Sequence, residues 1–193
     1  MEQEIKKFED FGAFTRVKDE GQYTITTIWF ISESDDDSKG SRLKACLCMR
    51  GDTEENIDMI RADSPTAHKD SLKLALAIAA NDNFDLVSGD IKSAFLQGMS
   101  LERQVYVVPP LEANEPDTLW LLEKGANGIL DGSRLFYWEL KKKLVSLGMK
   151  PVSGDTALFT IHENNQLIGI VCIHVDDLLM AGNYQFRQVI REN

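Results

Sequence analysis

Apolar and polar residues alternate in two segments near the start of the chain. β-Branched and aromatic residues dominate residues 23–31, which predicts a strand. In residues 43–49 every second residue is apolar, and this period predicts a second strand that pairs with the first as a hairpin. The acidic run E-S-D-D-D at 33–37 lies between them and is interpreted as a solvated loop. Residues 52–63 are polar and irregular.

The helical spacing of apolar residues predicts a first helix after this region. It begins at Asp70 or Ser71, ends near Ala80, and is followed by the helix-breaking run N-D-N at 81–83. Four residues form its apolar stripe: Leu72, Ala75, Leu76 and Ala79.

The strongest helical period lies in the second half of the chain. Ser133 is predicted to cap a helix that continues to about Leu147, and Gly148 follows as the C-terminal glycine. Four residues form its apolar face: Phe136, Leu140, Leu144 and Leu147.

Short apolar segments predict the remaining strands. They cover residues 84–91, 105–108, 119–122, 157–161, 167–175 and 178–181. Residues 92–97 are predicted to form a short helical turn, and E-N-N-Q at 163–166 is predicted to close a hairpin. Interleaved strands and helices with antiparallel hairpins predict an α+β fold rather than a doubly wound sheet.

The composition refines this picture in a few respects. A chain of 193 residues with 43% hydrophobic residues can form one domain or two packed lobes with a core. Cys46, Cys48 and Cys172 fit neither a disulfide framework nor a zinc site, so we expect reduced core thiols. The nearly apolar stretch 167–175 is too short to span a bilayer, and the N-terminus is acidic rather than signal-like. An intracellular protein without a membrane segment is therefore predicted.

The formal net charge of −10 argues against a simple nucleic-acid binder, because such proteins usually carry a basic face. Net charge governs solubility and non-specific association, however, so the chemistry of one site can outweigh it.

Three aspartates stand at the ends of apolar segments. Asp176 and Asp177 separate two strands of buried character, and Asp90 ends the strand 84–91. Ionised carboxylates beside buried strands are costly unless a cation compensates. Taken alone, the pair is also typical of a turn and Asp90 of a strand end. Together the three carboxylates can bind Mg²⁺, and two such ions about 3.5–4 Å apart catalyse phosphoryl transfer.

The order of several motifs resembles the reverse transcriptases of copia-type retrotransposons. Residues 90–98 read D-I-K-S-A-F-L-Q-G, similar to the family's D-[VI]-K-[TS]-A-F-L-x-G. Residues 102–110 resemble E-x-x-V-Y-x-x-x-P, and H-V-D-D-L-L at 174–179 resembles the Y-V-D-D motif. The resemblance runs in consistent order from about residue 26 to residue 182.

Three further segments extend the resemblance. Residues 44–51 are similar to K-A-R-L-V-x-[KR]-G. Residues 128–137 and 147–150 are similar to Y-G-L-K-Q-x-x-R-x-W-Y and the L-G-F stretch that follows it. The resemblance implies fingers and palm with an antiparallel palm sheet: an N-terminal segment and fingers over about 1–83, and a truncated palm over about 84–193.

The resemblance also implies the catalytic roles. Asp90 and Asp176 would bind two Mg²⁺ ions, with Asp177 as a supporting carboxylate and the Ile91 carbonyl as a further ligand. The reaction would be RNA-directed DNA synthesis, in which a primer 3′-hydroxyl attacks the α-phosphate of a deoxynucleoside triphosphate.

Substrate contacts follow from the same resemblance. Lys44 and Arg50 would meet the incoming triphosphate, and Phe95 would block a 2′-hydroxyl. Without the resemblance, Phe95 is typical of a core residue, and Lys44 and Arg50 of exposed strand residues. The implied template and primer contacts are Gly128, Arg134 and His174.

Five positions depart from the family pattern. His174 replaces the usual tyrosine, and Cys46 replaces an arginine. Asn127, Leu130 and Asp131 stand where tyrosine, lysine and glutamine are usual.

The expected partners are an RNA or DNA template with its primer and deoxynucleoside triphosphates. The chain ends eleven residues after Gly182, so thumb and ribonuclease H regions are expected to be missing. Two alternatives stay open: a truncated or decayed remnant without activity, and an acidic interaction module whose aspartate pair is only a turn. The expected location is a cytoplasmic virus-like particle or the nucleus.

Overall fold

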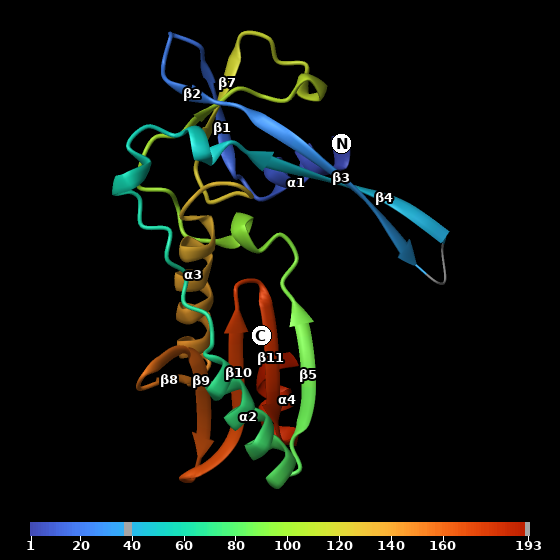
Figure 1. Cartoon of the computed structure of the whole chain (residues 1–193), viewed down its shortest axis with the longest axis vertical. Helices are drawn as coiled ribbons and strands as arrows, with labels where there is room; N and C mark the ends of the chain where they lie inside the picture. Colours follow the sequence, from blue (N-terminus) through green and yellow to red (C-terminus); the bar gives the residue numbers. More distant parts are fainter. Residues whose placement is uncertain (37–39, 192–193) are drawn as a thin grey trace. The chain divides into compact units, whose positions relative to one another are not determined.

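The computed structural model describes residues 1–36 and 40–191, without the side chains of 34–36 and 40–42. The chain forms two compact units, and each consists of two separate segments (Figure 1). Unit 1 comprises Met1–Ala62 and Phe95–Phe136, and unit 2 comprises Asp63–Ala94 and Tyr137–Asn193. The chain therefore passes between the units three times, the last time within the helix α3, Gly132–Ser146.

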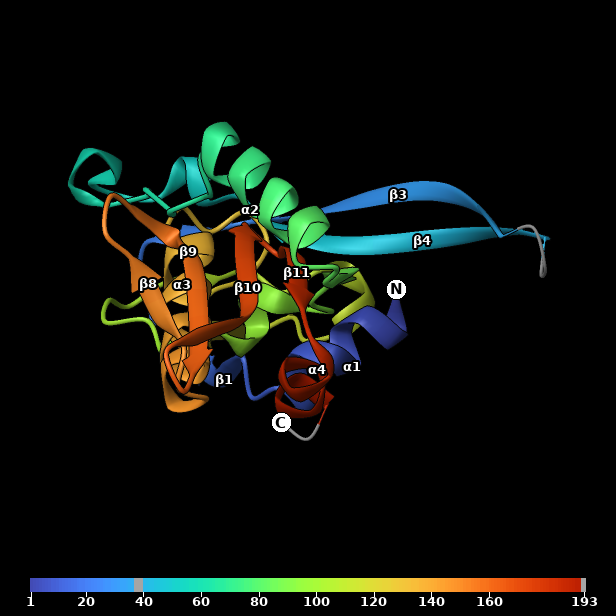
Figure 2. The same ribbon diagram turned by 90° about the horizontal axis from the view of Figure 1, so that it is seen from below.

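Unit 1 holds a four-stranded sheet and a separate hairpin. The sheet has the order β1-β7-β6-β2, in which only the β2–β6 pair is parallel. Its strands are β1 (Phe14–Lys18), β2 (Thr24–Ile25), β6 (Tyr106–Val107) and β7 (Thr118–Leu122). The strands β3 (Thr27–Asp36) and β4 (Gly40–Met49) pair with each other as a long antiparallel ribbon (Figure 2).

Short helical elements complete unit 1. They are α1 (Glu2–Asp10), η1 (Gly51–Thr53), η2 (Ile57–Met59), η3 (Ala94–Gln97, which starts at the last residue before the unit boundary) and η4 (Leu111–Ala113). The core joins Phe8 of α1, Leu47 of β4 and Trp120 of β7, which are almost fully buried. Trp120 stacks on Phe14, with the ring centroids 4.0 Å apart. The helix α1, the hairpin and the sheet thus share one core.

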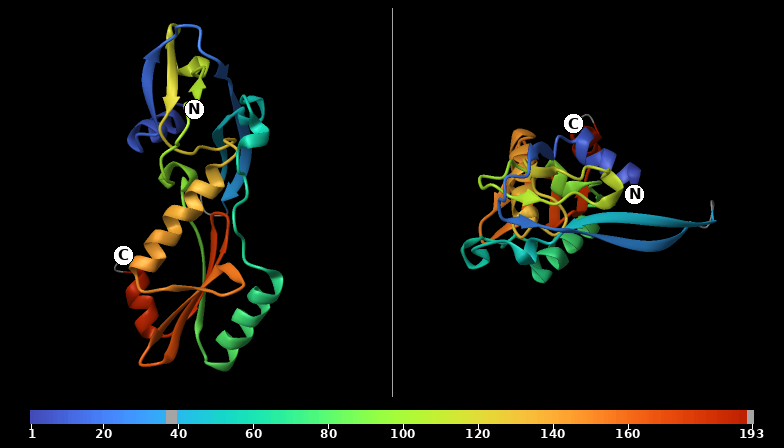
Figure 3. Two further views of the ribbon diagram at one scale, coloured as in Figure 1. Left: turned by 90° about the vertical axis from the view of Figure 1, so that its left-hand side faces the viewer. Right: turned by 90° about the horizontal axis from the view of Figure 1, so that it is seen from above.

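Unit 2 is an antiparallel sheet with helices on both faces (Figure 3). The strand order is β5-β11-β10-β9-β8. These strands are β5 (Asp85–Asp90), β8 (Lys150–Val152), β9 (Asp155–Glu163), β10 (Gln166–His174) and β11 (Asp177–Gly182). The helix α2 (Lys69–Asn81) covers one face, and α3 with α4 (Tyr184–Arg191) covers the other.

Successive residues of β10 serve the two faces of this sheet. Ile170 and Cys172 pack in one cluster with Ala75 of α2. Val171 and Ile173 pack in another cluster, which includes Tyr137 of α3. Because strand side chains alternate between faces, a strand covered on both faces is apolar throughout. This arrangement explains the unbroken apolar run of β10.

The prediction of a mixed fold with antiparallel hairpins is confirmed. The predicted strand 43–49 pairs with the segment before it, and Asn164 and Asn165 close the β9–β10 hairpin with φ angles of +49° and +63°. Two consecutive positive φ angles suit a two-residue hairpin turn, and asparagine tolerates them. Gly148 ends α3 with φ +86°, as predicted.

The prediction of a solvated loop at 33–37 is wrong for residues 33–36, and residue 37 lies outside the described residues. These residues continue β3, with Glu33 opposite Leu43 and Asp36 opposite Gly40. Backbone pairing along the hairpin outweighs the low strand propensity of the acids.

The predicted start of α2 and its apolar face are also wrong in part. The helix begins at Lys69, so Asp70 and Ser71 lie inside its first turn. Ala75 and Ala79 are buried, whereas Leu72 and Leu76 are 37% and 38% exposed. Small residues let the helix approach the sheet closely, and the leucines flank that contact.

The three cysteines are free, as predicted, but only Cys172 is a core residue. Burial raises the pKa of Cys172 to about 11. Cys46 and Cys48 are half-buried, because the face of β4 that they share is covered only in part. Burial, followed by the neighbouring Cys46, raises the pKa of Cys48 to about 12. In the described part of the chain, no helix has the length and apolar character needed to cross a membrane.

Candidate active site

A strained two-residue turn joins β10 to β11 in unit 2. His174 pairs with Asp177, which leaves Val175 and Asp176 as the turn. Val175 has φ +59°, a left-handed conformation that β-branched residues avoid. Such a residue costs about 1–3 kcal/mol and persists only where its surroundings hold it. The turn places the two adjacent aspartates at the tip of the hairpin.

The sheet brings the three predicted aspartates together. Asp177 lies directly opposite Asp90, because β11 pairs with β5 along its whole length. The Ile91 N–H donates to the Asp176 carbonyl over 3.1 Å, so the end of β5 is also tied to the turn. The predicted clustering of these residues is thus present in the backbone.

His174, Asp177 and Asp90 form a row across three neighbouring strands. Residues directly opposite each other in a sheet project from the same face, so the three side chains share one face. They line a hollow of about 520 Å³ whose other walls are mainly apolar, including Leu72, Cys172 and Leu179. Asp176 does not line this hollow, since it lies in the turn.

The row carries negative charge that the described residues do not neutralise. Among the basic side chains that the structure describes, none forms an ion pair with Asp90, Asp176 or Asp177. Directly opposed like charges repel, so a cation would stabilise the arrangement. The donor set fits Mg²⁺, which takes carboxylate oxygens and keeps several waters. No three His, Cys, Asp or Glu side chains in the described part converge on a common metal position, however.

The predicted triphosphate contacts lie on the hairpin side of unit 1. Lys44 is exposed on β4, and Arg50 directly follows that strand. Arg50 donates through Nε and Nη2 to the two oxygens of Asp52, both over 2.8 Å. This hydrogen bond raises the pKa of Arg50 and lowers the pKa of Asp52. A triphosphate would therefore have to displace Asp52 from the guanidinium.

Phe95 and Arg134 lie near the two ends of the second segment of unit 1. Phe95 is half-buried and packs edge-to-face on Phe136, with ring centroids 6.5 Å apart. Arg134 is half-buried in the first turn of α3. The predicted site residues are divided between the two units. The predicted substrate contacts in unit 1 are Lys44, Arg50, Phe95, Gly128 and Arg134. The predicted site residues in unit 2 are Asp90, Ile91, His174, Asp176 and Asp177.

Gly128 lies in a tight contact that only glycine allows. It has φ +86°, and a Cβ atom added to it would lie 2.1 Å from the Met49 carbonyl oxygen. A Cβ atom on Gly51 would lie 2.3 Å from the Gly128 carbonyl oxygen. The loop that carries Gly128 therefore packs backbone to backbone against the end of β4.

Sequence reasoning missed a buried ionic cluster in unit 1. Arg103 lies between Glu54 and Asp131 and forms ion pairs of 2.8 and 2.6 Å with them. Arg103 stands at a variable position of its motif, and the acid at 131 was noted only as a departure. That unexpected acid was the one available signal, since an acid in a partly apolar segment requires a cationic partner.

The comparisons with known proteins identify one family. Residues 13–190 match the family described as reverse transcriptase (RNA-dependent DNA polymerase). The retrovirus-related Pol polyprotein from transposon RE2 of Arabidopsis thaliana is 28% identical over 158 residues, covering 80% of this chain and 11% of that protein. The corresponding polyprotein from transposon TNT 1-94 of Nicotiana tabacum is 27% identical over 189 residues, covering 94% and 14%.

A yeast relative gives the same result over a shorter segment. The transposon Ty1-MR1 Gag-Pol polyprotein of Saccharomyces cerevisiae is 30% identical over 118 residues, covering 61% of this chain and 6% of that protein. The matched segment is thus at most 14% of the length of these relatives. The chain belongs to the reverse transcriptase family of RNA-directed DNA polymerases, a family of nucleotidyltransferases, and is similar to the Pol polyproteins of copia-like transposons.

Proposed function

We propose that this chain is the polymerase part of a copia-type reverse transcriptase, with two Mg²⁺ ions at Asp90, Asp176 and Asp177. The main observation in support is the register between β5 and β11. It sets Asp177 opposite Asp90, and Asp176 lies next to them in the turn. When bound, the ions would lower the pKa of a primer 3′-hydroxyl and stabilise the leaving pyrophosphate. The strained turn at Val175 supports the proposal, because such strain concentrates at functional sites.

The chain's own residues would bind and orient the substrates. Lys44 and Arg50 would attract the triphosphate, and Arg50 would exchange its bond to Asp52 for one to phosphate. Phe95, held by Phe136, would form the aromatic wall against a 2′-hydroxyl. Gly128, Arg134 and His174 would lie along the RNA or DNA template and its primer.

The fold supports a division into fingers and palm. The sheet of unit 2, with helices on both faces and the aspartates at one end, is the proposed palm. The hairpin of β3 and β4 is the proposed fingers element. The proposed setting is a cytoplasmic virus-like particle or the nucleus, where template and nucleotides are present.

The metal site can be tested by titrating the chain with Mg²⁺ in a calorimeter. We expect saturable binding that Asp90→Asn and Asp177→Asn each abolish, since each removes a charged ligand. Asp70→Asn is the matched control, because the Asp70 side chain is 94% exposed on α2 in the same unit. It should bind Mg²⁺ like the unchanged chain.

Nucleotide binding provides the second test. A fluorescent deoxynucleoside triphosphate should bind to the chain loaded with a template–primer duplex in the presence of Mg²⁺, and Asp90→Asn should weaken that binding.

Two outcomes of these tests would favour the alternatives. A linear, non-saturable Mg²⁺ titration would contradict the proposal and favour an acidic module with a simple turn. Saturable Mg²⁺ binding without nucleotide binding would favour a remnant that has lost its substrate site.

A further inference from the structure

The end of β4 and the loop 126–131 of unit 1 form one close-packed backbone contact. The Met49 N–H donates to the Asn127 carbonyl over 2.7 Å, and the Gly128 backbone lies against Met49. The Asn127 side-chain amide reaches the Cys46 sulfur over 3.1 Å. Cys46 and Asn127 both depart from the family pattern, so two unusual residues meet in this contact. The segment that carries Lys44 and Arg50 is thereby joined to the segment that carries Gly128.

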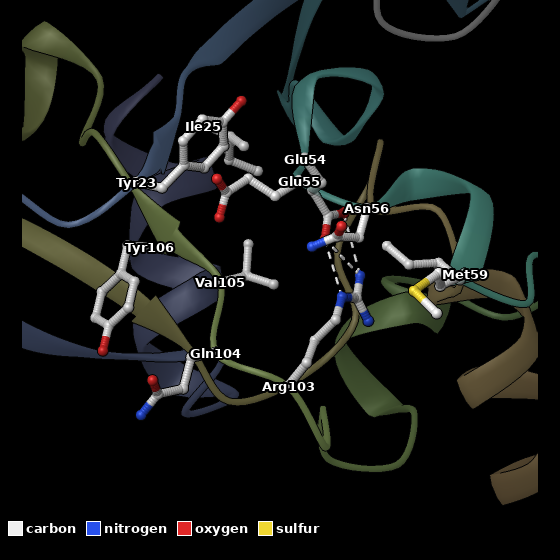
Figure 4. A pocket seen from close by; sticks show the side chains of 11 residues that line it. Tyr23, Ile25, Glu54, Glu55, Asn56, Met59, Arg103, Gln104, Val105 and Tyr106 are labelled. Carbon is white, nitrogen blue, oxygen red and sulfur yellow. Dashed lines mark hydrogen bonds and ion pairs between the residues drawn. The ribbon is translucent and has the colours of Figure 1, made fainter.

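Arg103 connects the same two segments from the other side. Its Nε donates to Glu54 over 2.9 Å, and its Nη1 donates to Asp131 over 2.6 Å. Glu54 follows β4 and η1 in the chain, and Asp131 immediately precedes α3. Figure 4 shows the Arg103 side chain extended toward Glu54, with both hydrogen bonds between them drawn. One guanidinium thus links the residues after β4 to the end of the loop 126–131.

Both acids have Arg103 as an ion-pair partner, and the backbone of Leu130 also contributes a hydrogen bond to Glu54. The side chains of Glu54 and Asp131 are only 6% and 16% exposed, and Arg103 is their common ion-pair partner among the described residues. Burial raises the pKa of Glu54, and the bonds from Arg103 offset part of that rise. Burial lowers the pKa of Arg103, but the hydrogen bonds to Asp131 and Glu54 outweigh it and raise the pKa overall.

The geometry of the guanidinium is essential to this link. The second oxygen of Asp131 is buried without a hydrogen-bond partner among the described residues, so the first oxygen's bond to Arg103 is its main compensation. A planar fork can serve two carboxylates in different directions at once, whereas a lysine ammonium is a single point charge. Loss of the arginine would leave two largely buried acids without an ion-pair partner, which strongly destabilises the contact around them.

We propose that Arg103 is a positioning residue that holds the loop 126–131 against the end of β4, so that Lys44, Arg50 and Gly128 keep one arrangement around the incoming nucleotide. This inference rests on the proposed function, because it concerns that nucleotide site. Arg103 acts through the loop and need not touch the nucleotide itself.

The experiment compares Arg103→Lys and Arg103→Met with the unchanged chain by hydrogen exchange and nucleotide binding. The Met49 amide reports on the contact, since its N–H bonds to the loop. We expect its exchange rate to rise about tenfold in both variants, as the local contact opens. The affinity for a fluorescent deoxynucleoside triphosphate should fall about five- to tenfold, while Mg²⁺ affinity, which belongs to unit 2, stays within about twofold.

Arg16→Lys is the matched control. Arg16 also bridges two acids of unit 1, Glu9 and Glu115, but it lies in β1. Its variant should leave both the Met49 exchange rate and nucleotide affinity unchanged. This control separates the position of Arg103 from the general loss of an arginine bridge.

Two results would overturn the inference. One is an unchanged Met49 exchange rate in both Arg103 variants. The other is faster exchange with unaltered nucleotide affinity, which would make Arg103 purely structural. An unchanged chain that binds no nucleotide would instead count against the proposed function, and Met49 exchange would still show whether Arg103 holds the loop.

Discussion

Two acidic clusters in this chain differ in what surrounds them. In unit 1, Glu54 and Asp131 are largely buried and share Arg103. In unit 2, Asp90 and Asp177 face each other across two strands, and no described basic side chain pairs with them. The first cluster includes a cation from the protein itself, whereas no described basic side chain supplies one to the second. The number of acids therefore says less about function than the presence or absence of a partner.

Backbone strain follows the same division. The loop 126–131 bends at Gly128, a residue suited to its positive φ angle. The turn between β10 and β11 bends at Val175, a residue poorly suited to it. The unit 1 loop is thus built for stability, and the unit 2 turn retains strain beside unpaired charge, as is common where a ligand binds.

Gly128→Ala should have the largest effect on the free energy of unfolding, because it disrupts the close-packed loop of unit 1. Alanine is strained at φ +86°, and its Cβ would meet the Met49 carbonyl oxygen. We expect a loss of about 3 kcal/mol in the free energy of unfolding, measured with urea. Gly21→Ala, at φ +84° with open space around it, should cost only about 1 kcal/mol. Equal losses would mean that the close packing of the loop contributes nothing.

Asp155 is a buried acid of unit 2 whose carboxylate is hydrogen-bonded. Replacing it tests whether an acid with partners also stabilises the fold of that unit. It accepts hydrogen bonds from the backbone N–H of His68, over 2.9 Å, and of Ala157, over 3.1 Å. Burial raises its pKa, but the hydrogen bonds from Ser71 and these amides outweigh burial and lower it overall. The stabilisation is therefore present above the unfolded-state pKa of about 3.9 and is lost as the pH falls through the lower, folded-state pKa.

Asp155→Asn should remove about 2 kcal/mol at neutral pH, since the amide nitrogen cannot accept a hydrogen bond. The measurement is urea unfolding at neutral pH and at a series of pH values below 4. The difference between the variant and the unchanged chain should shrink as the pH falls through that range. A difference that is constant with pH would show that the charge of Asp155 is irrelevant.

The same substitution should have opposite effects in the two clusters. Asp131→Asn should destabilise the chain by about 1–2 kcal/mol, because it weakens a charged hydrogen bond to Arg103. Asp177→Asn should stabilise the metal-free chain by about 0.5 kcal/mol, because it removes a like charge opposite Asp90. Thermal unfolding at low ionic strength without Mg²⁺ would measure both. Destabilisation by Asp177→Asn would contradict the description of the second cluster as uncompensated.

Val175→Gly should have an effect as small as that of Asp177→Asn. Glycine relieves the strain of the left-handed conformation but adds disorder to the unfolded chain, so a net gain of about 0.5 kcal/mol is expected. Asn164→Gly is the control, because asparagine already tolerates its φ of +49°. It should leave the unfolding free energy nearly unchanged or slightly lower. A loss of stability in Val175→Gly would show that the turn is not strained.

Local patterns predicted the elements that carry the candidate site. Apolar runs predicted the three strands around Asp90, Asp176 and Asp177, and the acids themselves mark the strand ends, although only β10 is buried along its length and β5 is largely exposed. Hairpin pairing between neighbouring segments follows from chain proximity. The pairing of β5 with β11 was not predicted, because no local signal joins strands so distant in the chain, and only the family resemblance implied that their aspartates act together.

Features that depend on distant partners could not be predicted. The N-terminus of α2 is bound by Asp155, which lies 87 residues after His68, so a search for a local cap pointed to Asp70 or Ser71 instead. The role of Asp131 likewise depends on Arg103, 28 residues earlier in the chain. Tertiary contacts of this kind leave no periodic trace in the sequence.

The interleaving of the two units has a consequence for synthesis on the ribosome. Asp90 emerges with β5, but its partner strand β11 begins at Asp177, about 90 residues later. At about 5–20 residues per second, β5 waits roughly 4–18 s for that partner, and the backbone N–H and C=O groups that later bond to β11 stay unpaired during this time. Unit 1 also stays incomplete until Phe136 has been made, after the first segment of unit 2 has already emerged. Translation speed between Asp90 and Asp177 therefore governs how long the nascent chain is vulnerable to aggregation.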